Sequence, residues 1–422
     1  KTVTVTDAYA ASGFDFSGTR AFDKRTGYRS TSFVCVPLVD HRKNVIGVLQ
    51  LLNSLAPNGI VVPFPPHTIP VVEALAGFAG VAIENQQLID GQRRLFDALI
   101  EMMAKAIDAK SPYTGGHCQR VPALTEMLAK AACETTEGPF ADYNLTEAEW
   151  YELQVAGGLH DIGKVVTPVH VMDKSTKLEG IHDRIGEIRL RFELAKQALT
   201  IAHLEGRADE HMVRKQTLAL DEDLAFLERS NIGSEFLGDE AIERIRVIAL
   251  REVTIAGKSQ RMLSDDEIAN LCIRRGTLNA DERKIINDHI VHTLDMLEAL
   301  PWPKHLRNVP HIAGTHHEKM DGTGYPRKLR RHEISPLGRM MAIADIYEAL
   351  TAQDRPYKPP KPISESLRIM AAMCRDHHVD PDLFALFVTS GVYRAYGERF
   401  LLPEQLDSVD ESAILAAAAP RI

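Results

Sequence analysis

The sequence has few cysteines and no excess of basic residues. Its five cysteines are scattered along 422 residues, and no two of them stand in a C-x-x-C spacing. This distribution excludes a disulfide framework and a thiolate zinc site, and it predicts reduced thiols in a cytoplasmic protein. The formal net charge of -9 argues against non-specific binding to nucleic acid, because the phosphate backbone attracts basic surfaces.

Long apolar runs are also missing. No run approaches the roughly 18 to 20 residues that cross a bilayer, and residues 76–83 are typical of a core segment. We therefore expect no membrane span in this chain. The sequence begins at Lys1 without a signal-peptide pattern, which is compatible with a fragment of a longer protein. With 422 residues, we expect two or three domains.

The N-terminal part combines strands with one long helix. Residues 32–39 (SFVCVPLV) and 45–53 (VIGVLQLLN) are apolar, β-rich runs on either side of a polar turn, which predicts a hairpin. From residue 71 the period becomes helical, and apolar residues recur every seven positions at Leu75, Ala82, Ile89, Phe96 and Met103. This seam favours either a parallel coiled coil between two protomers or a single amphipathic helix packed on its own domain.

Most of the sequence after residue 111 is helical in period. Thr146 and Glu149 form a capping box that predicts a helix ending near Gly163. Further helices are predicted over 281–300 and 337–352. The charged stretch 176–276 has few histidines and is interpreted as an inserted helical hairpin or small subdomain.

Histidines and carboxylates gather in the second half of the chain. His160 and Asp161 are adjacent in "GLHDIGK", at the expected end of a helix, and Asp345 lies in "AIADIYEAL". Between them, one stretch contains six histidines: His289, His292, His305, His311, His316 and His317. Imidazole and carboxylate ligands without thiolate favour iron, manganese or zinc. His292, His305 and His311 are interpreted as structural or surface residues.

The adjacent pair His316 and His317 suits two neighbouring ions better than one, so we infer a two-metal site. Two ions about 3.5 to 4 Å apart hold a hydroxide and clamp a phosphoryl group, which indicates phosphodiester hydrolysis. Gly322 and Gly324 in "DGTGYP" would let the backbone approach a ligand. Lys164, Arg355 and Lys358 could supply positive charge to phosphates. Tyr325 could stack on a base or pack within its loop.

These motifs resemble the HD-GYP family of the HD phosphohydrolase superfamily, which hydrolyses cyclic di-GMP in bacteria. The similar segments are "HDIGK" (160–164), "IINDH" (285–289), "HHEKMDGTGYP" (316–326), "AIAD" (342–345) and "TAQDRPYK" (351–358), and the resemblance covers about residues 100–400. It implies an all-α bundle, two divalent ions, most simply iron or manganese, and catalytic roles for Asp161 and Lys164. The implied metal ligands are His160, Asp161, His289, His316, His317 and Asp345. Arg355 and Lys358 would contact substrate phosphates, beside Gly322, Gly324 and Tyr325.

The chain departs from the family pattern at two places. Some members carry a glutamate four residues before the position of His117, together with a third metal, whereas this chain has Tyr113. We therefore expect two ions, with His117 as a peripheral ligand or phosphate contact. After the GYP motif, Lys328 and Arg331 stand where many members keep glycines, which adds positive charge to that loop.

The N-terminal part resembles the second half of a GAF domain, in "TGYRSTSFVCVPL", "VIGVLQLLNS" and "LAGFAGVAIENQQL". The expected fold is therefore multidomain, with an α+β GAF-like sensory part, a linker helix and an all-α HD-type bundle. We place these at 1–90, 91–110 and 111–400, with an insertion at about 176–276 and a tail at 401–422. The GAF part would bind a small molecule. Two copies of the chain would form a homodimer through the GAF part and the linker helix.

The leading functional hypothesis is metal-dependent hydrolysis of cyclic di-GMP to linear pGpG, GMP or both, regulated by the GAF part. One alternative is hydrolysis of another cyclic dinucleotide. A second alternative, from a different class, is a catalytically weak receptor that binds the dinucleotide and signals through protein contacts.

Overall fold

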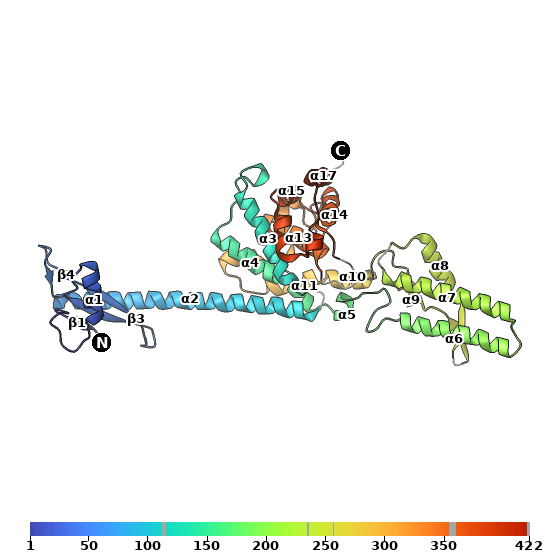
Figure 1. Cartoon of the computed structure of the whole chain (residues 1–422), viewed down its shortest axis with the longest axis horizontal. Coiled ribbons are helices and arrows are strands. Elements are labelled where there is room, and N and C mark those ends of the chain that lie inside the picture. The colour runs from blue at the N-terminus through green and yellow to red at the C-terminus, as the bar shows by residue number, and fades with distance from the viewer. Residues whose placement is uncertain (112–114, 234–235, 256, 354–359, 420–422) are drawn as a thin grey trace. The chain divides into compact units, whose positions relative to one another are not determined.

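The computed structural model of the protein describes residues 1–111, 115–233, 236–255, 257–353 and 360–419. The chain divides into two compact units, Lys1–Leu99 and Ile100–Ile422. Figure 1 labels their helices and strands.

The first unit is built on a three-stranded antiparallel sheet in the order β1-β2-β3. Strands β2 (Phe33–Val39) and β3 (Val45–Leu52) form the predicted hairpin, with Phe33 opposite Leu52. Sequence reasoning gave no prediction for the elements before the hairpin. The elements of this unit outside the hairpin are β1 (Val3–Val5), α1 (Ser17–Thr26), β4 (Ser54–Leu55), β5 (Val61–Val62), η1 (Pro66–Thr68) and the start of α2 (Ile69–Lys110).

Helix α2 runs from Ile69 to Lys110, as its period predicts. Val72 and Ala76 in its first turns are buried against the apolar side of β2. The heptad seam lies on another side of the helix: Leu75 is 57% exposed, Ile89 57% and Met103 42%. The seam therefore does not hold α2 on its own sheet, which disfavours the second of the two interpretations above.

Helix α2 also bears on the expectation that no segment spans a membrane. The stretch Pro66–Lys110 contains an 18-residue window of mean hydropathy 1.3, enough by length and composition alone to cross a bilayer. It is the one such candidate in the described part of the chain. Helices of proteins that never enter a membrane can have the same length and hydropathy. The buried Val72 and Ala76 pack the start of α2 on the folded sheet.

The second unit is a bundle of short helices, coloured from green to red in Figure 1. Helix α3 packs against α13, α4 and α16, and helix α12 packs against α4, α11 and α13. The bounds of the bundle elements are α3 (His117–Glu134), η2 (Gly138–Phe140), α4 (Glu147–Leu159), η3 (Ile162–Val165), α5 (Val169–Met172), α10 (Ala280–Asn287), α11 (His289–Glu298), η4 (Lys304–Leu306), α12 (Val309–Gly314), η5 (Arg331–Glu333), α13 (Pro336–Thr351), α14 (Ile363–Arg375), α15 (Pro381–Thr389), α16 (Val392–Phe400), η6 (Pro403–Gln405) and α17 (Glu411–Ala418).

Two predicted helices end differently from expectation. Helix α4 has the predicted capping box of Thr146 and Glu149, but it ends at Leu159, and the chain continues as the 3-10 helix η3. The helix predicted over 281–300 is broken at Asp288 into α10 and α11. Just after the break, Gly163 lies against the first turn of α11 and its N–H donates to the Thr293 hydroxyl (2.9 Å).

The segment between residues 176 and 276 has a hydrophobic core of its own, built around Ile188, Phe192, Leu227 and Ile245. Its elements are α6 (Ile185–Leu204), α7 (Glu210–Ile232), α8 (Asp239–Ala249), β6 (Glu252–Ile255), β7 (Lys258–Arg261) and α9 (Asp265–Leu271). The expectation of a helical hairpin or small subdomain did not include the β6–β7 strand pair. An independent core means that the segment packs as a body within the second unit.

Candidate metal centre

The histidine and aspartate side chains singled out in the sequence meet inside the helical unit. They are contributed by the ends of helices far apart in the chain: His160 caps the C-terminus of α4, His289 opens α11, and His316 follows α12. Asp345 lies within α13. The imidazole rings of His160 and His316 are 5.1 Å apart, and those of His316 and His317 are 4.1 Å apart.

Three of these imidazoles are oriented in the same way by the backbone. The Nδ1 of His160 donates to the Gly157 carbonyl (2.7 Å), that of His289 to Ile286 (2.5 Å), and that of His316 to Ala313 (2.6 Å). A carbonyl only accepts, so Nδ1 carries the proton and Nε2 presents its lone pair. This is the orientation that a metal-binding histidine adopts when its other nitrogen is fixed.

The Asp161 carboxylate lies among these nitrogens. Its Oδ2 accepts from Lys164 Nζ (2.5 Å) and lies 3.3 Å from His160 Nε2, and its Oδ1 lies 3.3 Å from His289 Nε2. His160 Nε2, Asp161 Oδ1 and His316 Nε2 are buried and have no hydrogen-bond partner among the described residues. Buried polar atoms without partners are costly unless something satisfies them, and a cation at their centre would do so.

The charges of the site are set by burial and by one another. Burial would raise the pKa of Asp161, but Lys164 and His160 outweigh it and hold that pKa well below its usual value. Burial and the neighbouring His160 lower the pKa of His316 to about 4. Burial, His316 and His289 lower the pKa of His317. At neutral pH the site therefore offers the Asp161 carboxylate and the neutral imidazoles of His316 and His317, which are the protonation states that bind metal.

The ligand atoms fall into two groups, each with its atoms within 4.8 Å of one another. One group is His289, His316 and His317, and the other is His117, His160 and Asp161. Nitrogen and oxygen donors without sulfur suit iron, manganese or zinc. The donor set, together with the buried unpartnered atoms, therefore fits divalent metal. Asp345 lies at the edge of the second group, with its Oδ1 3.5 Å from His117 Nε2.

His117, expected as a peripheral ligand or phosphate contact, belongs to a buried hydrogen-bond network that the sequence analysis did not describe. Its Nδ1 is 2.7 Å from Glu348 Oε2 and its Nε2 is 3.0 Å from Asp161 Oδ2, while Arg120 donates to the other oxygen of Glu348. Burial and Lys164 lower the pKa of His117, but hydrogen bonds to Asp161 and Glu348 outweigh them and raise it to about 9. Helical spacing could have revealed both partners, because Arg120 follows His117 by three residues and Glu348 follows Asp345 by three.

The loop after His317 is held by the chain itself. The Tyr325 ring stacks on His317, with centroids 5.0 Å apart. A side chain on Gly324 would lie 2.3 Å from the Lys319 nitrogen, and Gly322 has a φ of 82°. Both glycines are thus required by the local backbone. Glu318 is buried and accepts from the N–H groups of Arg327 (2.7 Å) and Leu329 (3.0 Å), so it neither orients an imidazole nor faces solvent.

Other residues named in the sequence are not gathered at the cluster. Arg331 pairs with Asp380 and Asp382, so its charge is already matched within the protein. His305 is exposed, and His311 Nε2 lies 3.3 Å from the Ser335 nitrogen. Arg355 and Lys358, expected to contact phosphates, and Tyr113 lie outside the described residues.

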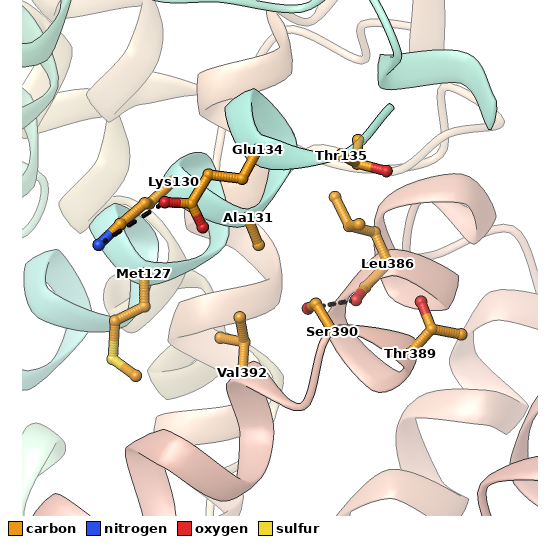
Figure 2. Close-up of a pocket in the computed structure, with 9 residues that line it drawn as sticks. All are labelled: Met127, Lys130, Ala131, Glu134, Thr135, Leu386, Thr389, Ser390 and Val392. Carbon is orange, nitrogen blue, oxygen red and sulfur yellow. Dashed lines mark hydrogen bonds and ion pairs between the residues drawn. The ribbon is translucent and has the colours of Figure 1, made fainter. Parts of the chain in front are cut away.

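A surface cavity of about 520 Å³ lies elsewhere in the bundle (Figure 2). The C-terminal half of α3 lines one side of it with Met127 and Ala131, and Leu386 and Val392 line the other. None of the candidate ligands lines this cavity. It is therefore separate from the metal centre.

Comparison with known proteins identifies a domain in each unit. Residues 1–83 match the family model of the GAF domain, and residues 260–383 match that of an HD domain. The HD match includes His289, His316, His317 and Asp345.

Several bacterial phosphodiesterases are similar to this chain. The 3'3'-cGAMP-specific phosphodiesterase 3 of Vibrio cholerae is 24% identical over 344 residues, which cover 76% of this chain and 48% of that protein. A cyclic di-GMP phosphodiesterase of Pseudomonas aeruginosa is 47% identical over 79 residues, 18% of each protein. One of Thermotoga maritima is 38% identical over 98 residues, 23% of this chain and 26% of that protein. The chain spans half or less of the length of these relatives. It carries a GAF domain in its first unit and an HD domain in its second.

Proposed function

We propose that this protein is a metal-dependent phosphodiesterase of the HD-GYP type that acts on a cyclic dinucleotide. The observation that supports this most directly is the gathering of buried imidazoles around the Asp161 carboxylate: His160 Nε2 and His289 Nε2 each lie 3.3 Å from it, and His160 Nε2 and His316 Nε2 have no hydrogen-bond partner among the described residues. The similarity to enzymes that hydrolyse cyclic dinucleotides points to the same reaction.

The proposed site takes two divalent ions, iron or manganese. The two ligand groups support this number, because each supplies three ligand atoms and Asp161 has an oxygen near both. His117 is left as a peripheral ligand, since both of its nitrogens face carboxylates. It would have to release a proton before binding an ion. Bound divalent ions would lower the pKa of a water and neutralise phosphate charge.

The chain's own residues have separate roles in this proposal. Asp161 binds metal through its oxygens. Lys164, whose ammonium is fixed 2.5 Å from Asp161 Oδ2, places a positive charge beside the reacting phosphate. Tyr325, stacked on His317, forms a wall against which a base can pack. Arg355 and Lys358 are proposed to bind the phosphates, together with the loop of Gly322 and Gly324.

Cyclic di-GMP is the first candidate substrate, with pGpG, GMP or both as products. The second candidate is 3'3'-cGAMP, because the relative that covers 76% of this chain is specific for it. The two substrates differ in one purine. Discrimination would therefore depend on a hydrogen bond to that base rather than on the metal centre.

The test is hydrolysis by purified protein loaded anaerobically with Fe²⁺ or with Mn²⁺, followed by chromatography of products from each dinucleotide. Asp161→Ala should remove turnover of both substrates. His305→Ala, an exposed histidine in the same unit, is the matched control and should keep it. Elemental analysis of the same samples should give two ions per chain. A stoichiometry near three would show that His117 holds a further ion.

One result would replace this proposal with the receptor alternative. If the parent protein binds either dinucleotide but forms no linear product with either metal, it acts as a receptor. The intact set of ligand positions favours the enzyme, because binding of a dinucleotide alone does not require buried, unpartnered imidazoles.

We further propose that the protein is cytoplasmic and forms a homodimer through α2. Apolar residues occupy three heptad positions of this helix and are exposed: Leu75, Phe78, Val81, Leu88, Ile89, Leu95, Leu99, Met102 and Met103. A stripe of this length, repeated every seven residues, fits a second copy of the same helix in a coiled coil. A small molecule bound by the GAF domain would then regulate the HD domain through α2.

A further inference from the structure

The last turn of α2 is joined to the segment that follows the His160-Asp161 pair. Lys110 Nζ donates to the carbonyl oxygens of Lys164 (2.8 Å) and Thr167 (2.6 Å), and also to that of Val165. The carbonyls of Lys164 and Val165 belong to the end of η3, where backbone acceptors have few partners within the helix, and the Thr167 carbonyl lies just after it. The Lys164 carbonyl also accepts from Thr167 N–H (3.1 Å). None of the three acceptors is a carboxylate. Lys110 therefore acts as a C-terminal cap supplied from another helix.

Neighbouring contacts fix the same end of α2. Ala104 and Ile107 are buried, and Ser111 Oγ donates to Asp173 Oδ1 (2.5 Å). The Asp108 carboxylate accepts from the N–H groups of Gly116 (3.1 Å) and Cys118 (3.3 Å), directly before and after His117. The end of α2 thus contacts both backbone segments that carry the ligand group of His117, His160 and Asp161.

Apart from Lys110, the segment that it caps is held by the packing of Gly163 on α11 and by the hydrogen bond from Gly163 N–H to Thr293 Oγ1 (2.9 Å). Its internal hydrogen bonds are those of η3 and the turn after it, from Lys164 N to Asp161 O, Val166 N to Gly163 O and Thr167 N to Lys164 O. Single 3-10 turns of this kind are weak, because their hydrogen-bond geometry is poor. One ammonium that binds the carbonyls of Lys164, Val165 and Thr167 would therefore contribute to the rigidity of the segment from Asp161 to Thr167.

We infer that Lys110 is a positioning residue for the reaction: by capping η3 it holds Asp161 and Lys164 in place, so that the end of α2 controls the geometry of the metal centre. Lys110 does not touch the candidate ligands and acts through the backbone of Lys164. This inference rests on the proposed function for its catalytic consequence. The claim that Lys110 caps η3 does not depend on the proposed function, because it follows from the hydrogen bonds to the backbone.

The test uses the full chain with Lys110→Met, which keeps the length of the side chain and removes its donors. Lys105→Met is the matched control, because Lys105 lies on the same helix and its Nζ bonds to the exposed Glu101. Hydrogen exchange of metal-free protein, read on peptides covering residues 160–168, should be faster by about tenfold in Lys110→Met. It should be unchanged in Lys105→Met. Lys110→Arg, which restores several donors, should return the exchange toward the parent rate.

The effect of Lys110 on catalysis is measured separately, as kcat and KM of the same variants. In protein loaded with Mn²⁺, Lys110→Met should lower kcat by about tenfold with little change in KM, because a displaced Asp161 affects the transition state more than substrate binding. Lys110→Arg should recover kcat. If Lys110→Met does not fold, Lys110→Gln, with a shorter donor, gives the same comparison.

Two results would overturn the inference. Unchanged exchange over residues 160–168 in Lys110→Met would show that Lys110 does not hold η3. Faster exchange with unaltered kcat would show that this rigidity has no role in the reaction. If the parent protein has no phosphodiesterase activity, the proposed function fails. The exchange data and the Mn²⁺ affinity of the three variants then still decide whether Lys110 positions the metal ligands.

Discussion

Gly163 lies so close to His289 that a methyl group on it would be 1.9 Å from the His289 carbonyl oxygen. Gly163→Ala should therefore push η3 away from α11 and separate Asp161 from His289. We expect a loss of roughly 1 to 3 kcal/mol of stability, as for other overpacked cores, and Mn²⁺ binding weaker by about tenfold or more. Thermal unfolding and metal titration measure the two effects. Gly186→Ala, where a side chain meets open space, should change neither.

Glu318 should matter for the shape of the substrate loop rather than for metal binding. Its two carboxylate oxygens accept from two backbone N–H groups, those of Arg327 and Leu329. Glu318→Gln leaves one oxygen and places a donor against the other N–H, so the loop after Tyr325 should loosen. We expect KM to rise several-fold with the metal content unchanged. Glu333→Gln, an exposed residue bonded to one N–H in the same loop, should leave KM as it is.

Asp380 predicts a pH-dependent stability. Burial would raise the pKa of this carboxyl, but hydrogen bonds from Arg331 and Arg339 outweigh it and lower the pKa. A lowered folded pKa means that the stabilisation is present above the unfolded value of about 3.9 and is lost as the pH falls through the folded value. Asp380→Asn should therefore cost about 3 kcal/mol at pH 7, and this difference should shrink below about pH 4. Denaturant unfolding at several pH values measures it. The exposed Asp376→Asn should show no such trend.

Metal removal should lower the stability of the HD domain specifically. An ion that binds only the folded state, at a hundredfold excess over its Kd, stabilises that state by about 2.7 kcal/mol. Treatment with a chelator should therefore lower the Tm of the transition assigned to the second unit, and Mn²⁺ should restore it. The transition of the GAF unit should not move. Equal shifts in both transitions, or none in either, would contradict a metal centre confined to the cluster around Asp161.

The dimer proposal depends on the exposed stripe of α2. Ile89→Asp places a charge in the centre of this stripe and should convert dimers into monomers at micromolar concentration. Gln87→Asp lies two residues away, at an outer heptad position, and should leave the dimer intact. Analytical ultracentrifugation distinguishes the two. A parent protein that sediments as a monomer would rule out the coiled coil.

The sequence predicted much of the fold because its signals were local. The β2–β3 hairpin, the capping box at Thr146 and both ends of α2 follow from patterns within a few residues. The break at Asp288 could not be predicted in this way. The contact of Gly163 with α11 beside this break was equally hidden, because it joins residues more than 100 positions apart in the sequence.

In the metal site, too, local patterns could be predicted and contacts between distant residues could not. Spacing and residue type singled out the histidines, Asp161 and Asp345, and the structure brings them together. Neither property indicated that Lys110 caps η3 or that Asp380 neutralises Arg331, because each pairing depends on how separate helices pack. Local sequence signals also gave no reason to expect Glu318 to accept from the backbone of its own loop.

The Nδ1 atoms of His160, His289 and His316 are each fixed by a carbonyl three residues earlier. A main-chain acceptor cannot be deleted by exchanging a side chain, so related sequences cannot retune these three rings one at a time. Side-chain substitution can instead act on the groups that other side chains hold, such as Asp161 with Lys164 and His117 with Glu348. The backbone at the helix ends fixes the tautomers of these three histidines. Metal preference can therefore change through the polar side chains around them.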